Sequence, residues 1–169
     1  SDKSDKDITA LAFEAFVRTW KEEGFPYPVP KEIEAEGDYK TKTPTIALEM
    51  IFNYVTQRRP QIAKMNLIAI ERPFAVVLDP EDKDFPLYIG RIDKEFSTNE
   101  GVYAAEHKTT GLLRKESKFS QDWIDLFSIS PQVHGYNHKL HIDYGDKARG
   151  VWVDAALCHK EHHDAFKFI

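Results

Sequence analysis

Cysteine is almost absent from the sequence, which contains Cys158 alone. One thiol excludes an internal disulfide framework, and it excludes a four-cysteine iron–sulfur cluster built from this chain. The sequence also has no run of about 18 apolar residues, the length of a membrane span, and its first residues do not resemble a signal peptide. We therefore expect an intracellular, cytoplasmic protein that makes no membrane contact.

An excess of positive charge is missing as well, because the formal net charge is -5. A DNA-binding protein of this charge needs local basic clusters, or metal ions that neutralise its acidic residues. The sequence offers three such clusters, which are equally compatible with ordinary solvated surface charge: Lys40 with Lys42, Arg58 with Arg59, and Arg114 and Lys115 with Lys118. There is no phosphate-binding loop of the G-x(4)-G-K-[ST] kind, so no helicase motor is present.

Charged residues are concentrated where a hairpin should carry apolar ones. The segment from Leu87 to Thr110 reads as two strands joined by a turn at residues 97–101. Because side chains alternate along a strand, Glu106 and Lys108 project from one face, about 6 to 7 Å apart, and His107 points to the other. An antiparallel partner brings Asp93 beside them. Carboxylates on a half-buried surface are costly unless a cation lies between them, so the pattern favours a divalent metal.

These residues also resemble a known family. The sequence Gly90-Arg91-Ile92-Asp93, followed by Glu106-His107-Lys108-Thr109-Thr110, is similar to the G-x-x-D … (D/E)-x-K-T signature of the PD-(D/E)xK nucleases, in particular their RecB-like exonuclease branch. Gln132-Val133-His134-Gly135-Tyr136 resembles the Q-x-x-x-Y motif of that branch. Each motif is weak alone, and their order and spacing carry the resemblance.

The resemblance implies an α/β fold with a restriction-endonuclease-like core, a central mixed β-sheet flanked by helices. It implies a metal-dependent deoxyribonuclease, an exonuclease acting in DNA recombination, repair, phage replication or defence. Mg²⁺ or Mn²⁺ would be held by Asp93, Glu106, the backbone carbonyl of His107, and Glu49 from an upstream helix. Asp93, Glu106 and Lys108 are the catalytic residues that it implies, while Gln132 and Tyr136 would position the DNA backbone or brace the site. DNA is the implied partner, and a homo-oligomer or a larger recombination complex stays open.

The length of 169 residues fits a single domain, which we divide into an N-terminal helix and connector (1–43), a nuclease core (44–157) and a His-rich tail (158–169). Apolar spacing predicts helices over residues 8–23 and 43–58, the second ended by Pro60 and largely buried. It predicts strands over 66–78, where Pro73 implies an edge position or a bulge, over 150–157 and over 165–169. Helices are expected over 121–129 and from Pro131 onward. Residues 25–30 and 31–42 read as connector and loop, and 111–120 as a loop near the site.

Histidine suggests a different kind of site. His134, His138 and His141 recur on one helical face, and Cys158, His159, His162 and His163 cluster near the end of the chain, which would suit zinc. On a helical wheel, however, the first three lie roughly opposite Gln132 and Tyr136 and should face away from the proposed active centre, as solvated or packing histidines. The alternatives to a nuclease are thus a zinc-binding protein, or a non-catalytic module for DNA binding or assembly on a nuclease fold.

Overall fold

The computed structural model describes residues 3–34, 42–79, 81–82, 84, 86–111, 119–159, 162 and 164–169. The basic residues Lys40, Arg114, Lys115 and Lys118, and also His163, lie outside these ranges, as does most of the loop expected at 111–120. The chain forms two compact units. The first, the helical unit, comprises Ser1–Ile62, Thr109–Lys118 and Ala156–Phe166; the second, the sheet unit, comprises Ala63–Lys108, Phe119–Ala155 and Lys167–Ile169. The single-domain organisation expected from the length stays a prediction.

Helix α1 (Asp5–Glu22) opens the helical unit. Ser4 and Asp7 form a reciprocal capping box at its start, and Gly24, at φ 86°, follows its end, as the sequence predicts. The proline-rich residues 25–30 are irregular, and the loop expected next begins instead with one helical turn, α2 (Lys31–Glu34).

Helix α3 (Pro44–Ile62) packs against α1 and differs from prediction in two ways. Pro60 lies inside the helix instead of ending it, because a proline near the last turn removes one backbone hydrogen bond and leaves the following ones intact. The helix is also not largely buried: Leu48 and Phe52 are exposed, since its apolar residues surround the helix, whereas α1 and residues 164–166 contact only part of it.

A mixed sheet of five strands, in the order β1–β2–β3–β4–β5, gives the chain the expected α/β class. Its members are β1 (Asn66–Val77), β2 (Leu87–Thr98), β3 (Gly101–Thr110), β4 (Ala148–Leu157) and β5 (Phe166–Phe168). β1 occupies an edge, which accommodates Pro73. A restriction-endonuclease-like core stays a prediction.

The strand directions follow from the hydrogen bonds. β2 is antiparallel to β1 and to β3. β3 and β4 begin together, where Arg149 Nε donates to Glu100 O, and end together, where Cys158 N donates to Thr110 O, so they run parallel. Val153 and Ile169 exchange both backbone hydrogen bonds, as antiparallel neighbours do. The connection between the parallel strands contains α4 (Gln121–Asp125), the 3₁₀ turn η2 (Leu126–Ile129), α5 (Pro131–Tyr144) and η3 (Gly145–Lys147).

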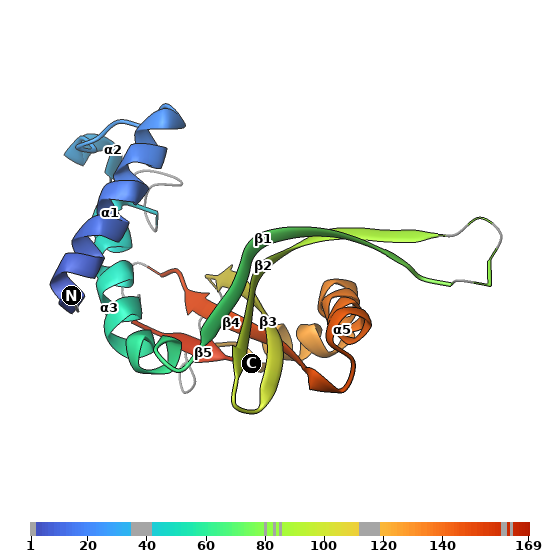
Figure 1. The fold of residues 1–169 in the computed structure, drawn as a ribbon. Coiled ribbons are helices and arrows are strands. Elements are labelled where there is room, and N and C mark those ends of the chain that lie inside the picture. Colours follow the sequence, from blue (N-terminus) through green and yellow to red (C-terminus); the bar gives the residue numbers. More distant parts are fainter. Residues whose placement is uncertain are drawn as a thin grey trace. The chain divides into compact units, whose positions relative to one another are not determined.

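Helix α5 covers one face of the sheet unit. Ser130 caps its first turn and Pro131 occupies its first position, as the sequence predicts. Tyr136 and Leu140 point from α5 into the core, where they meet Phe74, Ile92 and Ala104 of the strands. The outer part of the β1–β2 hairpin continues past the other strands and lies beside α5 (Figure 1).

The ladder of hydrogen-bonded pairs is interrupted where this outer hairpin leaves the sheet. β1 and β2 pair at Ile70↔Lys94 and again at Arg72↔Ile92, but Glu71 and Asp93 between them form no regular pair. The β2–β3 ladder ends at the same level, with Lys94↔Ala105. Glu71 has φ 52°, the one positive value recorded for a non-glycine residue of the described chain. Three strands thus lose regular pairing together, and the candidate site lies at this break.

Candidate active site

Asp93 and Glu106 lie just beyond the end of the β2–β3 ladder. The last regular pair is Lys94↔Ala105, so Asp93 and Glu106 are the next residues on the two strands and form no regular pair. The negative charges of both carboxylates act on the Tyr136 hydroxyl, and Asp93 accepts a hydrogen bond from the residue that follows Glu106. The two carboxylates are therefore neighbours, and a cation shared between them stays a prediction.

The break gives Asp93 a structural partner. Because β2 leaves β3 on the N-terminal side of Lys94, the backbone N–H of His107 has no ladder partner on β2, and it donates to Asp93 Oδ2 at 2.9 Å. The side chain takes the place of a missing strand hydrogen bond and satisfies this backbone donor. Asp93 is thereby fixed beside the segment that carries Glu106 and Lys108.

Glu106 is buried, and its two carboxylate oxygens differ in their hydrogen-bond partners. It is 4% exposed, and Oε1 accepts from Lys108 Nζ at 2.5 Å and from Gln132 Nε2 at 2.9 Å. Oε2 is fully buried and has no hydrogen-bond partner among the described residues. A buried carboxylate oxygen without a donor is expensive, as it is for Glu95 Oε1 in the same unit, so this atom is available to a cation or to an ordered water.

Gln132 and Tyr136 brace the site from α5. The Gln132 amide nitrogen donates to Glu106 Oε1 and to the Tyr136 hydroxyl at 2.8 Å, which confirms that the two residues share one helix face. The Tyr136 hydroxyl in turn donates to the carbonyl oxygen of Arg91 at 2.6 Å. One chain of hydrogen bonds therefore ties α5 to β3 and to the bend of β2.

The surroundings of Tyr136 keep its proton in place. Burial raises the pKa of Tyr136 to about 12, and the negative charges of Glu106 and Asp93 raise it further, whereas the hydrogen bond from Gln132 lowers it. Both carboxylates thus act on the same hydroxyl group, which agrees with their positions on the α5 face. Tyr136 is a neutral donor throughout the physiological pH range.

The residues present fit a hard divalent cation. Asp93 and Glu106 supply oxygen ligands, and the neighbouring carbonyl of His107 is a third candidate. No group of three His, Cys, Asp or Glu side chains with metal-binding geometry occurs in the described ranges. Mg²⁺ commonly uses one or two protein carboxylates and completes its octahedron with water and phosphate oxygens, so two carboxylates are sufficient.

Glu49, the fourth ligand implied by the family resemblance, belongs to the helical unit. Its side chain is exposed on α3 and lines a pocket with Lys6, Thr9 and Phe52. Its part in a metal site stays a prediction.

The histidines of α5 lie on its exposed side, as the helical wheel predicts. His134 Nε2 is 2.9 Å from the carbonyl oxygen of Ser128, and His141 Nδ1 is 2.8 Å from that of Asn137. In the helical unit, the rings of His159 and His162 lie 5.4 Å apart. A zinc site formed by these residues stays an untested alternative.

Sequence reasoning missed two further polar groups of the sheet unit. Asp154 is buried on β4, and its Oδ2 is 3.6 Å from His107 Nδ1; an acidic residue within the apolar run 151–157 was the available signal. Glu95, also buried, accepts from Arg72 at 2.7 Å and from the Tyr144 hydroxyl at 3.0 Å. No sequence pattern predicted the contacts of Glu95 with Arg72 and Tyr144, because they depend on how α5 lies against β1.

Comparison with models of known protein families finds no match, and neither does comparison with curated proteins. The resemblance to the RecB-like nucleases therefore rests on the motifs, and function must be argued from the geometry of the site. Within the described ranges, no helix combines the length and the hydropathy that a membrane span requires.

Proposed function

We propose that this chain is a divalent-metal-dependent DNA nuclease that hydrolyses phosphodiester bonds as an exonuclease. The observation that carries the proposal is Glu106 Oε2, a buried oxygen with no partner among the described residues, on a carboxylate that neighbours Asp93 and pairs with Lys108. The ion pair with Lys108 uses Oε1 and leaves Oε2 available to a cation.

The residues divide the work of phosphodiester hydrolysis. Asp93, Glu106 and the carbonyl of His107 would hold Mg²⁺ or Mn²⁺, which would supply charge neutralisation and lower the pKa of a water. Lys108, about a third exposed and paired with Glu106 at 2.5 Å, would orient the attacking water as a cation and offset charge that develops on the phosphate; to deprotonate that water it would first have to lose its own proton. Gln132 holds Glu106 in orientation, and Tyr136 holds the backbone of β2 two residues before Asp93.

The decisive experiment compares purified variants on labelled linear DNA with Mg²⁺, Mn²⁺ or EDTA. We expect Asp93→Asn and Glu106→Gln to lose detectable cleavage, and Lys108→Ala to lose about 10² to 10⁴-fold, the usual contribution of a general base. Asp146→Asn and Lys147→Ala, which change exposed residues of η3 in the same unit, serve as charge-matched controls and should cleave normally. Thermal unfolding verifies that each variant is folded.

Closed circular DNA distinguishes the kind of nuclease. An exonuclease degrades linear DNA in a metal-dependent way and leaves closed circles intact. Cleavage of both would make the protein an endonuclease. Wild-type protein that binds DNA without cutting it in either metal would support the non-catalytic alternative, and full activity in Glu106→Gln would remove the proposed site.

A further inference from the structure

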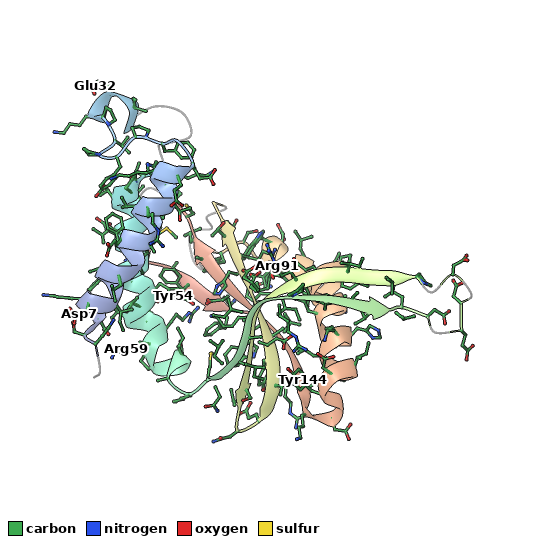
Figure 2. All side chains as sticks on the ribbon, turned by 45° about the horizontal axis from the view of Figure 1, so that its top comes forward. Asp7, Glu32, Tyr54, Arg59, Arg91 and Tyr144 are labelled. Carbon is green, nitrogen blue, oxygen red and sulfur yellow. The ribbon has the colours of Figure 1, made fainter. Side chains whose placement is uncertain are left out.

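The backbone and the side chain of Arg91 have different surroundings. Its carbonyl oxygen is anchored by the Tyr136 hydroxyl at 2.6 Å, which fixes this point of β2 beside the candidate active site. Its guanidinium, by contrast, is 68% exposed and pairs through Nε with Glu71 Oε2 at 2.8 Å. Figure 2 labels Arg91 near the bend where the hairpin leaves the sheet. Arg91 thus combines an anchored backbone with a solvent-accessible guanidinium cation.

Glu71, its partner, is strained. Its φ of 52° lies in the left-handed region, which a glutamate rarely occupies because its longer side chain does not stabilise that conformation as Asn or Asp can. Glu71 lies between the pairs Ile70↔Lys94 and Arg72↔Ile92, and therefore opposite Asp93. Strain of this kind is concentrated at functional sites. The Glu71–Arg91 pair itself is half-exposed, so it contributes little to stability and does not explain why the strain is kept.

We propose that Arg91 binds the DNA phosphate next to the phosphate at which the strand is cleaved. Glu71 is then a positioning residue: its carboxylate holds the guanidinium of Arg91 until a DNA phosphate takes the place of that carboxylate. This inference rests on the proposed function. Arg91 precedes Asp93 by two residues, about 7 Å along a strand, so its exposed guanidinium belongs to the strand that carries one of the proposed metal ligands. Guanidinium pairs with phosphate through parallel hydrogen bonds, and the carboxylate of Glu71 competes for the same donors.

The test measures DNA binding and cleavage separately. Binding of labelled linear DNA is followed by fluorescence anisotropy with Ca²⁺ in place of Mg²⁺, and cleavage is followed under steady-state conditions with Mg²⁺. We expect Arg91→Gln to raise both Kd and KM about tenfold and to change kcat less than twofold. The slope of log affinity against log salt should fall by about 0.7 to 0.9, the loss of one phosphate contact. Arg91→Lys, which keeps the charge, should recover part of the affinity and the whole slope.

Glu71 variants separate charge from backbone strain. Glu71→Gln removes the charge and keeps the side chain in its strained position, whereas Glu71→Gly removes the charge and the strain together. If the carboxylate restrains Arg91, both variants lower Kd and KM about threefold. Glu81→Gln, an exposed change of the same charge in the turn of the same hairpin, corrects for general electrostatic repulsion. Circular dichroism and thermal unfolding verify the fold of each variant.

The outcomes separate this inference from the proposed function. If the wild type cleaves DNA and Arg91→Gln changes neither KM nor the salt dependence of the binding affinity, the role of Arg91 is overturned and the proposed nuclease function stands. If Glu71→Gln binds DNA no more tightly than Glu81→Gln does, the role of Glu71 is overturned. Absence of cleavage in wild type, together with DNA binding that depends on Arg91, removes the nuclease function and supports the phosphate contact.

Discussion

Tyr136 connects the residues of the site through a single hydroxyl group. Its oxygen accepts from Gln132, its proton goes to the carbonyl of Arg91, and the side chain is 3% exposed within the core. Because the hydroxyl is buried beside two carboxylates, its neutral form is strongly favoured and its pKa is raised to about 12. Replacing this group tests both the bracing and the electrostatics of the site.

Tyr136→Phe should lower the free energy of unfolding by about 1 to 3 kcal/mol at pH 8, because the buried carbonyl of Arg91 loses its donor. The folded pKa, about 12, lies above the ordinary tyrosine value of 10, so this stabilisation is complete below pH 10 and is lost as the pH rises through 12. The stability difference between wild type and variant should therefore shrink by about 1.4 kcal/mol at pH 11. Urea unfolding at pH 8 and pH 11 measures this, and a difference independent of pH would contradict it.

At the residue scale, sequence periodicity predicted which side chains lie close together better than it predicted which groups they hydrogen-bond. Strand alternation was sufficient to bring Glu106 and Lys108 together, and helical spacing to bring Gln132 beside Tyr136. It could not reveal that Asp93 caps the His107 amide, because that bond exists only where β2 bends away from β3. The positive φ of Glu71 was equally hidden, since a glutamate gives no sign of that conformation.

Among the elements of the sheet unit, α5 approaches the hairpin through a glycine. A Cβ atom at Gly135 would overlap the ring of Tyr88 on β2, closer than van der Waals contact allows. The Tyr88 ring also packs against Phe74 of β1, with ring centroids 5.6 Å apart. Gly135 is unfavourable within a helix, so its presence is explained by this close approach, which keeps Gln132 and Tyr136 over the carboxylates.

Gly135→Ala should destabilise the protein by about 1 to 3 kcal/mol, because relief of the overlap requires α5 or the Tyr88 ring to move. The rate of DNA cleavage should fall as well, because Gln132 moves together with α5. Urea unfolding and the DNA assay measure the two effects. Gly111→Ala is the control, because a Cβ there meets the Cys158 carbonyl oxygen at an ordinary 3.6 Å. Tyr88→Ala combined with Gly135→Ala should cost less than the sum of the single changes, and strict additivity would exclude the overlap.

Element types were more predictable than element ends and exposure. The hairpin, the Ser130-Pro131 cap and the edge position of β1 all follow from local chemistry that the structure bears out. Helix α3 shows where local rules fail: its apolar composition predicted burial, yet burial depends on how many neighbours cover the helix. Sequence periodicity describes which faces are apolar and says nothing of what covers them.

At the scale of the whole molecule, the net charge of -5 must be reconciled with the polyanionic substrate of the proposed function. Asp93 and Glu106 place negative charge at the very point where a phosphate would bind. In the proposed function, divalent cations reverse the local sign of the potential without altering the rest of the surface. DNA binding should consequently depend on divalent ions even where no cleavage takes place.

We therefore expect Ca²⁺ to raise the affinity of wild-type protein for DNA at least about tenfold over EDTA. In EDTA, Glu106→Gln should bind DNA more tightly than wild type, because one repelling charge is gone, and Ca²⁺ should improve its binding less. Fluorescence anisotropy with labelled DNA measures both. Asp146→Asn provides the comparison for the same change of net charge at an exposed position, and an equal effect of the two variants would show that the site is not special.

The hydrogen bond from the His107 amide to Asp93 has a consequence for ion exchange. In the proposed function, an ion would bind the same carboxylate whose Oδ2 accepts from the backbone of β3. A carboxylate that also accepts a hydrogen bond donates less charge to an ion. Its affinity for the ion would be lower, which would favour exchange with ions in solution over permanent retention.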